Sequence, residues 1–171
     1  DCERSGDDGC NDPGEGGYAM GNPGMYTNVA LLDVESMHPH SIIVLNMFGK
    51  KYTARFAEIV EARLAIKHKD YELAGRLLGG VLKPYLTDPK NAKKVANALK
   101  TAINSVYGLT SASFDNELRD DRNVDNICAK YGALFMINLE EEVTKRGYKV
   151  AHIKTHSIKI ARSEERRVGK E

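Results

Sequence analysis

Three polar side chains are spaced along one predicted helix so that they share a face. Lys100, Asn104 and Tyr107 stand at positions i, i+4 and i+7, which places them within about 60° of one another on an α-helix. A cation, an amide and an aromatic ring in one row can hold a phosphate group and a nucleobase together. The residues alone leave two interpretations, a nucleotide-binding row and a solvated helix face.

Two basic residues and one acidic residue complete this set of candidates. Arg63 and Lys67 form an i, i+4 pair on the preceding predicted helix, and an antiparallel helical pair would bring both basic sets to one polyphosphate. Asp33 ends an apolar strand, and the turn that follows it offers backbone N–H groups. A carboxylate beside such donors suits a metal-bound phosphate. The alternatives are a turn-forming aspartate and a solvated basic face.

The composition sets limits on the class of protein. The chain has 171 residues, of which 42% are hydrophobic and 29% charged, a balance typical of a globular domain. It contains no apolar stretch long enough to span a membrane and no secretory signal pattern, and its three cysteines are too few for a disulfide framework. We therefore expect a cytoplasmic protein. Residues 50–100 carry twelve basic and five acidic side chains, a net charge of +7, which favours a polyanionic partner.

The apolar periodicity predicts an α+β fold. The pattern predicts a strand over residues 29–33, a turn and an apolar run over 36–48, and helices that must position the candidate side chains. Those helices are expected over 53–78, ended by glycines and a proline, over 89–106 with an Asp88 cap, and over 124–146. Two strands, 148–153 and 157–160, follow as a hairpin. Each predicted helix has an apolar face. For the helix over 53–78 the face contains Phe56, Ile59, Val60, Leu64 and Leu77. For the helix over 89–106 it contains Ala92, Val95, Ala96, Leu99, Ala102, Ile103 and Val106. For the helix over 124–146 it contains Val124, Ile127, Cys128, Tyr131, Phe135, Leu139 and Val143. Gly108 is expected to stop the second helix.

Both ends of the chain differ from its middle. Residues 1–16 are acidic and glycine-rich, with a net charge of −5, and we interpret them as a disordered segment. Residues 162–171, RSEERRVGKE, match one reading frame of a common sequencing adapter. We interpret them as read-through, which would make the chain a piece of a longer protein.

Three segments, in order, resemble the polymerase motifs of family B DNA polymerases, most closely those of bacteriophages. Residues 33–43, DVESMHPHSII, resemble motif A, usually written DxxSLYPSII. Residues 100–108, KTAINSVYG, match motif B, KxxxNSxYG, at every specified position. Residues 154–157, KTHS, fall where motif C, DTDS, belongs. The resemblance covers residues 17–160. It disfavours a palm-type reverse transcriptase or RNA polymerase, because motif B has the family B form.

The resemblance implies a role for each candidate residue. Asp33 would be a metal ligand, and the backbone around Ser36, Met37 and His38 would cradle the triphosphate, with His38 as the steric gate. The other nucleotide-binding positions would be Arg63, Lys67, Lys100, Asn104, Tyr107 and Gly108. The implied parts are a palm with an antiparallel sheet plus helix, at 17–48 and 108–161, and an inserted two-helix fingers subdomain at 49–107. The implied cofactor is a pair of Mg²⁺ ions, with Mn²⁺ as an alternative, and the implied partners are primer–template DNA and a dNTP.

Three positions depart from the family pattern. His40 is an extra residue in motif A, and Lys154 replaces the first aspartate of motif C. His156 replaces the second, the aspartate that would bind metal together with Asp33. A neutral imidazole supplies no negative charge and is a poor ligand for Mg²⁺. A single base change converts an aspartate codon to a histidine codon, so a real substitution and a sequencing error both remain open.

The sequence therefore predicts a palm-and-fingers fragment of a DNA-directed DNA polymerase, from a phage and hence located in the cytoplasm of its host. The exonuclease domain and the thumb would belong to missing parts of the polymerase chain. Such a fragment is expected to be poorly active or inactive. The rival hypothesis is a catalytically dead module that binds nucleic acid or nucleotides, and His156 favours it.

Overall fold

The computed structural model describes residues 17–119 and 126–161. The chain divides into two compact units, a sheet unit formed by residues 1–35 with 129–171 and a helical unit formed by residues 36–128. The fold is α+β with an antiparallel sheet, as the sequence predicts. The interpretations of residues 1–16 and 162–171, and the predicted helix start at residue 124, lie outside the described residues.

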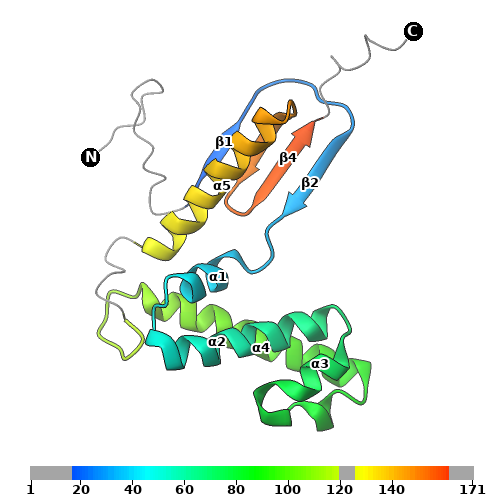
Figure 1. Cartoon of the computed structure of the whole chain (residues 1–171), viewed down its shortest axis with the longest axis vertical. Coiled ribbons are helices and arrows are strands. Elements are labelled where there is room, and N and C mark those ends of the chain that lie inside the picture. Colours follow the sequence, from blue (N-terminus) through cyan, green and yellow to red (C-terminus); the bar gives the residue numbers. More distant parts are fainter. Residues whose placement is uncertain (1–16, 120–125, 162–171) are drawn as a thin grey trace. The chain divides into compact units, whose positions relative to one another are not determined.

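Among its described residues, the sheet unit has four antiparallel strands in the order β1-β3-β4-β2. They are β1 (Ala19–Gly21), β2 (Val29–Asp33), β3 (Lys149–Lys154) and β4 (Ser157–Ala161). Strands β3 and β4 form the predicted hairpin, and β2 pairs with β4 along its whole length (Figure 1). This pairing places a strand from the start of the described chain beside one from its end. Strand β1 was not predicted, because its three residues are too short for a periodic signal.

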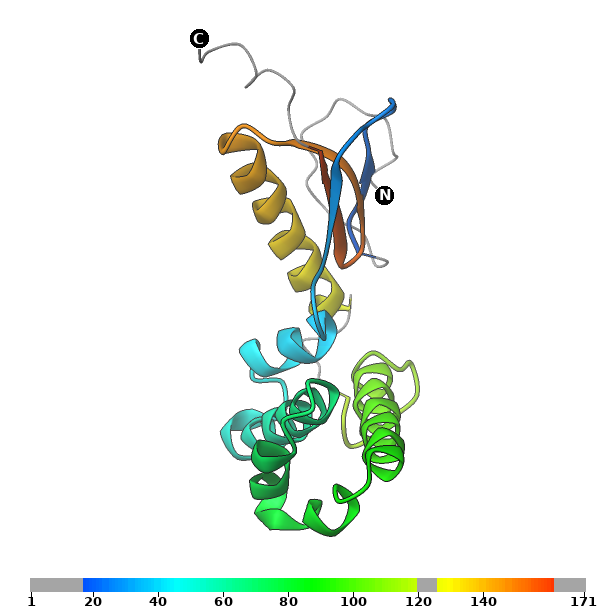
Figure 2. The same ribbon diagram turned by 90° about the vertical axis from the view of Figure 1, so that its right-hand side faces the viewer.

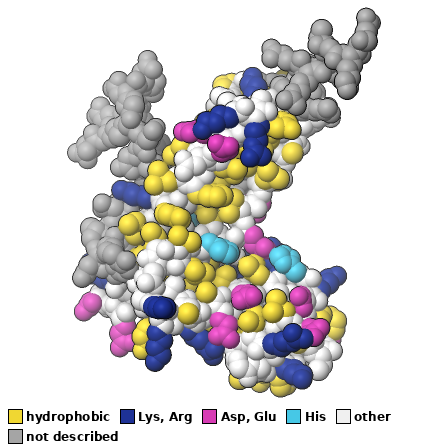
Figure 3. All heavy atoms as spheres, in the orientation of Figure 1, with side chains coloured by type: hydrophobic (Ala, Val, Ile, Leu, Met, Phe, Trp, Pro, Cys, Tyr) yellow, Lys and Arg dark blue, Asp and Glu magenta, His cyan; other side chains and the backbone are white. Residues whose placement is uncertain are grey.

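Helix α5 (Ile127–Lys145) lies along one face of this sheet (Figures 1 and 2). Its buried side includes Ala129, Ala133 and Met136. The predicted inward positions Tyr131 and Phe135 are wrong, since these side chains are 39% and 49% exposed, and hydrophobic side chains are visible over α5 in Figure 3. Small alanine side chains let the helix lie close to the sheet, so the helix turns its aromatic side away from it.

Tyr18 connects the start of the sheet unit to α5. Its hydroxyl donates a hydrogen bond of 2.8 Å to Oε2 of Glu140. Burial, followed by the hydrogen bond to Glu140 and the charge of that carboxylate, raises the pKa of Tyr18 from 10.0 to about 12. The folded state therefore holds the phenolic proton more tightly than the unfolded state does.

We expect this phenol to make the stability of the chain depend on pH at high pH. Its contribution to the free energy of unfolding is fully present below pH 10.0, and it is lost as pH rises toward about 12. Chemical denaturation at stepwise pH values should show a smaller loss over this window for Tyr18→Phe than for the unmodified chain. Tyr52→Phe, at an exposed tyrosine of α2, is the matched control and should keep the full loss. Equal losses in the two variants would contradict this role.

In the described residues, the helical unit has four α-helices and two short 3-10 segments. They are α1 (Met37–Val44), α2 (Gly49–Lys67), α3 (Tyr71–Arg76), η1 (Leu77–Gly80), η2 (Lys83–Tyr85) and α4 (Pro89–Thr110). The apolar run predicted over 36–48 contains α1. Pro39 is compatible with α1 because it stands in the first turn, where a backbone N–H has no partner within the helix.

The single helix predicted over 53–78 is wrong. Helix α2 ends at Lys67, and Lys69 adopts a left-handed conformation with φ 65°. The N–H groups of Lys69 and Asp70 donate to the carbonyls of Ile66 and Ala65, the pattern of a Schellman motif. Asp70 then caps α3, accepting a hydrogen bond of 3.0 Å from the N–H of Leu73. A lysine in the position that glycine usually takes gives no sequence signal for this break.

Helix α4 begins where the sequence predicts. The Asp88 carboxylate accepts hydrogen bonds of 3.3 Å from the N–H groups of Lys90 and Asn91. The helix continues to Thr110, so Gly108 does not stop it. Ala102, placed on the apolar face by the sequence pattern, is exposed. The cap fixes the start of the helix locally, and its last residue, Thr110, is buried.

Helices α2 and α4 pack antiparallel, as the sequence predicts. Phe56 and Val60, from the first half of α2, share a core cluster with Ile103, near the end of α4. Ala65 and Ile66, at the end of α2, share another with Ala92, at the start of α4. The start of each helix therefore lies beside the end of the other, and side chains of both helices line a common groove.

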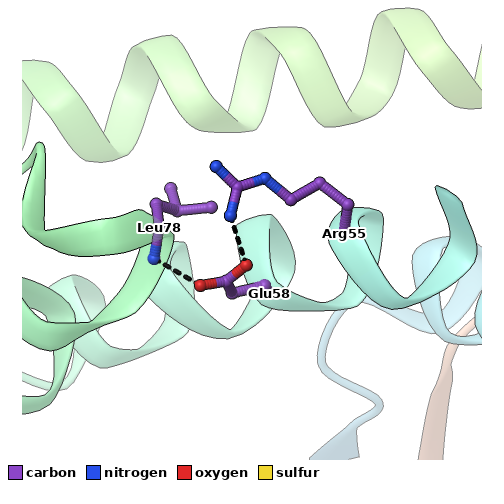
Figure 4. A network of polar contacts seen from close by, with 3 residues as sticks. All are labelled: Arg55, Glu58 and Leu78. Atoms are coloured by element: carbon purple, nitrogen blue, oxygen red, sulfur yellow. Dashed lines mark hydrogen bonds and ion pairs between the residues drawn. The ribbon is translucent and has the colours of Figure 1, made fainter. Parts of the chain in front are cut away.

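Glu58 holds the left-handed segment after α3 against α2 (Figure 4). Its Oε1 accepts a hydrogen bond of 2.5 Å from the N–H of Leu78, and its Oε2 accepts one of 2.5 Å from Nη1 of Arg55. The Leu78 N–H, followed by the Arg55 guanidinium, holds the pKa of Glu58 below its usual value. Leu78 and Gly79 have φ values of 55° and 69°, a conformation that is unfavourable for leucine and needs such an external contact.

We expect Glu58→Ala to loosen this segment. The Leu78 amide loses its acceptor and should exchange its hydrogen faster, which amide hydrogen exchange followed by NMR can measure. Glu61→Ala, at an exposed position of the same helix, is the matched control and should leave that rate unchanged. The same Leu78 rate in both variants would show that Glu58 does not hold the segment.

Candidate functional site

The sheet unit brings Asp33 and His156 together. Asp33 is the last residue of β2 and pairs with Ser157 of β4, and His156 stands in the turn between β3 and β4. The Val34 N–H donates to the His156 carbonyl at 2.8 Å. Nε2 of His156 lies 3.5 Å from Oδ1 of Asp33, with both side chains more than half exposed. The two side chains therefore lie next to each other, although His156 stands in a turn and not on a strand, and their chemical role is treated below.

The donor set at this position does not fit a pair of Mg²⁺ ions. It offers one carboxylate and one imidazole, whereas Mg²⁺ prefers oxygen ligands and two ions need carboxylates to bridge them. Across the described residues, no three His, Cys, Asp or Glu side chains gather into a metal-binding group. Asp33 and His156 can at most hold a single divalent ion, and a nitrogen ligand favours a transition metal over Mg²⁺.

Ser36, Met37 and His38 lie at the start of α1 in the helical unit. Ser36 is the N-cap residue, with φ 54°, and its side chain does not cap the helix. The Ser36 hydroxyl oxygen instead accepts a hydrogen bond of 3.0 Å from Nη1 of Arg63. The backbone N–H groups in the first turn of a helix point out of its N-terminal end, which therefore favours anions. Met37 is buried, so any contact of this residue with a ligand would come from its backbone.

His40, the extra residue of the motif A segment, also contacts the start of α1. Its backbone N–H donates to the Ser36 carbonyl at 3.0 Å. Its ring Nδ1 lies 2.9 Å from the same oxygen and donates to it in the tautomer that carries the proton there. The insertion is therefore accommodated by contacts to the Ser36 carbonyl oxygen.

His38 and Tyr107 form a stacked pair between α1 and α4. Their ring centroids are 4.6 Å apart and their planes differ by 14°. The Tyr107 hydroxyl donates to Oδ1 of Asn126 at 3.4 Å, and burial raises the pKa of this phenol. The phenol is therefore neutral at physiological pH, and its ring lies nearly parallel to the imidazole of His38.

A groove between α2 and α4 collects basic side chains. It has a volume of about 450 Å³ and includes Arg63, Lys67 and Lys100 in its lining. The sequence assigns four cationic or amide side chains to phosphate binding, and the structure brings three of them, Arg63, Lys67 and Lys100, to this groove. Asn104 lies outside this lining and is exposed on α4, as is Gly108. The row from Lys100 to Tyr107 therefore splits, with Lys100 at the groove and Tyr107 at the stacked pair.

The groove contains two further lysines that the sequence analysis missed, Lys69 and Lys93. No carboxylate is present among its described lining residues. On the face drawn in Figure 3, by contrast, acidic and basic side chains are interspersed over the helical unit. A sequence signal for Lys93 exists, because the positions 93, 97, 100, 104 and 107 continue one helical row. Lys69 has none, since it belongs to the unpredicted break after α2.

Comparison with known proteins supports a polymerase-like fold. No family model matches the chain, and no curated protein matches it. The solved structure of the family B DNA polymerase from the hyperthermophilic archaeon Pyrobaculum calidifontis is similar to it, with a TM-score of 0.51 and 18% sequence identity. The match covers 84% of this chain and 21% of the polymerase chain. The likeness is one of fold, and the chain spans about a fifth of that polymerase. Within the described residues, no helix has the length and apolar character that crossing a membrane requires.

Proposed function

We propose that the chain is the palm and fingers part of a DNA-directed DNA polymerase, with low or no activity by itself. The observation that carries this proposal is the basic groove between α2 and α4, lined by Arg63, Lys67 and Lys100. The polymerase-like fold and the KxxxNSxYG segment at 100–108 support it. The proposed reaction is template-directed transfer of a nucleotide to a primer 3′-hydroxyl. We also propose that the polymerase is of the bacteriophage type.

The helical unit binds the incoming nucleotide in this proposal. Cationic side chains of the groove neutralise the triphosphate and fix its orientation, which lowers the entropic cost of in-line attack. The start of α1, at Ser36, Met37 and His38, adds the N-terminal end of a helix, which favours phosphate oxygens. The stacked pair of His38 and Tyr107 provides a flat surface against the sugar and the nascent base pair. Asn104 and Gly108 lie on α4, as Tyr107 does, and belong to the same proposed nucleotide site.

The sheet unit supplies Asp33 as the carboxylate for a divalent ion. Such ions stabilise charge on the attacking and leaving oxygens in nucleotidyl transfer. His156 does not replace the second carboxylate, because its imidazole is neutral when it can bind a cation. The proposed low activity follows from this donor set, and Mn²⁺, which accepts nitrogen ligands more readily than Mg²⁺ does, is the better cofactor candidate.

A catalytically dead module that binds nucleotides or nucleic acid is the second candidate function. The presence of a single carboxylate beside His156 favours it. It would retain the basic groove and the stacked pair without nucleotidyl transfer. Metal-dependent primer extension by the unmodified chain, with Mg²⁺ or Mn²⁺, would exclude the dead module.

Nucleotide binding tests the shared part of both candidates. Titration calorimetry of dATP into the chain with primer–template DNA should show binding that weakens as salt rises. Deoxyadenosine, which keeps the base and sugar but lacks the phosphates, is the matched control and should bind far more weakly. Equal affinity for the two compounds would show that no triphosphate site exists.

A further inference from the structure

His40, the extra residue of the motif A segment, stands on the exposed side of α1. Ser36, His40 and Val44 are four positions apart, so they follow one another along one side of the helix and its first flanking residue. His40 and Val44 are exposed, whereas the neighbouring Ser41 and Ile42 are buried. Packing of the core therefore does not require an imidazole at position 40, and the contact that its ring makes needs another explanation.

Two groups of His40 converge on the carbonyl oxygen of Ser36. The backbone N–H donates to it at 3.0 Å, and the ring Nδ1 lies 2.9 Å from it. A carbonyl oxygen has two lone pairs and can accept both hydrogen bonds when Nδ1 carries a proton. Ser36 has a φ of 54°, a left-handed conformation that is unfavourable for serine and needs support from outside the residue. The ring of His40 supplies such support.

The Ser36 hydroxyl connects this turn to α2. It accepts a hydrogen bond of 3.0 Å from Nη1 of Arg63, a half-buried residue that lines the basic groove. A guanidinium has five N–H groups, so one hydrogen bond to Ser36 restricts its orientation while the others can still donate to an anion. The orientation of Arg63 at the groove therefore depends on where the Ser36 hydroxyl is held. All three residues belong to the helical unit.

We propose that His40 is a positioning residue that acts on Arg63 through Ser36. The ring holds the Ser36 carbonyl, the held backbone places the Ser36 hydroxyl, and the hydroxyl orients the guanidinium. The inference rests on the proposed function, in which Arg63 contacts the triphosphate of the incoming nucleotide. An arginine that is oriented before binding loses less conformational entropy when the phosphate binds, so the affinity for the nucleotide rises. In this proposal His40 itself does not contact the nucleotide.

Titration of dATP into the full 171-residue chain with primer–template DNA tests this proposal. His40→Ala removes the ring donor and keeps the backbone N–H, and it should weaken dATP binding by about three- to tenfold, the effect of one hydrogen bond. His40→Asn should restore the affinity, because the side-chain amide can donate from nearly the place of Nδ1. Val44→Ala, at an exposed position of the same helix, is the matched control and should bind like the unmodified chain.

A double-mutant cycle shows whether His40 acts through Arg63. In the Arg63→Ala background, His40→Ala should cause no further loss of dATP affinity, because the group that it orients is absent. Ser36→Ala keeps the carbonyl and removes the hydroxyl, and it should also make the affinity insensitive to His40→Ala. The same loss from His40→Ala in every background would overturn the proposal, because a residue that only stabilises the fold gives this result.

The rotation of the Arg63 guanidinium gives a readout without nucleotide. ¹⁵N NMR of the side chain should show slower rotation about the Nε–Cζ bond while the hydrogen bond to Ser36 is held, and faster rotation in His40→Ala and Ser36→Ala. His40→Asn and Val44→Ala should resemble the unmodified chain. Equal rotation rates in His40→Ala and the unmodified chain overturn the positioning role. Absence of dATP binding by the unmodified chain overturns the proposed function instead, so the two failures are distinguishable.

Discussion

The His156→Asp substitution is expected to raise Mg²⁺-dependent primer extension by about a thousandfold or more when residues 17–161 form the palm and fingers of a full-length polymerase. The side chain at position 156 already faces Asp33, with Nε2 3.5 Å from Oδ1. A second carboxylate there supplies the negative charge and the oxygen ligands that the present pair lacks. Several kcal/mol of charge stabilisation corresponds to about three decades of rate, at about 1.36 kcal/mol per decade.

The comparison needs a control for charge and one for DNA binding. His152→Asp introduces the same change four residues earlier on β3, a position that pairs with Lys159 instead of lying beside Asp33, and it should not raise the rate. DNA affinity should be similar in the histidine and aspartate forms. Comparable extension by the two forms would mean that position 156 is not a metal ligand and that the motif C alignment is wrong.

A direct metal titration gives this prediction a readout that does not depend on catalysis. Mn²⁺ binding to the 171-residue chain, followed by electron paramagnetic resonance, should tighten in His156→Asp and weaken in Asp33→Asn. The reason is electrostatic, because the first change adds a carboxylate to the pair and the second removes the existing one. Affinities unaffected by either change would place any bound ion elsewhere.

The Lys100→Ala substitution is expected to weaken dNTP binding by about tenfold or more. Lys100 lines the groove opposite α2, where it shares the cavity with Arg63 and Lys67. Removal of one of these cations loses a charge-assisted contact with the triphosphate, and the two others cannot move along rigid helices to replace it. In an active full-length polymerase the same change should raise the KM for dNTP or lower kcat.

Lys94→Ala is the matched control for Lys100→Ala, because it removes an exposed lysine from the same helix that does not line the groove. Its nucleotide affinity should equal that of the unmodified chain at moderate salt, where exposed charges are screened. An unchanged nucleotide response in Lys100→Ala would remove the triphosphate role from this residue. The groove would then need another ligand to account for its charge.

Elements with local chemical signals were predictable from the sequence. Strand β2 is a short apolar run that ends at Asp33, and α4 begins at an aspartate cap followed by a proline. The β3–β4 hairpin follows from two short apolar segments around a turn. These signals act between residues close in sequence, and so the positions of Asp33, Lys100 and His156 on their elements could be derived.

Other features could not be predicted, either because a residue departs from the usual local pattern or because distant segments decide the outcome. Lys69 adopts φ 65° because two Schellman hydrogen bonds and the Asp70 cap hold it there. The side of α5 that faces the sheet is decided by how closely Ala133 can approach the strands, and this turns Phe135 outward against its apolar character.

The candidate site shows the same division. The types and the order of its residues are properties of the sequence, including the exchange of a carboxylate for His156. Only the antiparallel packing of α2 against α4 placed Lys69 and Lys93 in one groove, although they are 24 positions apart along the chain. Such a juxtaposition has no local signal, because it results from the burial of apolar side chains where the two helices pack together.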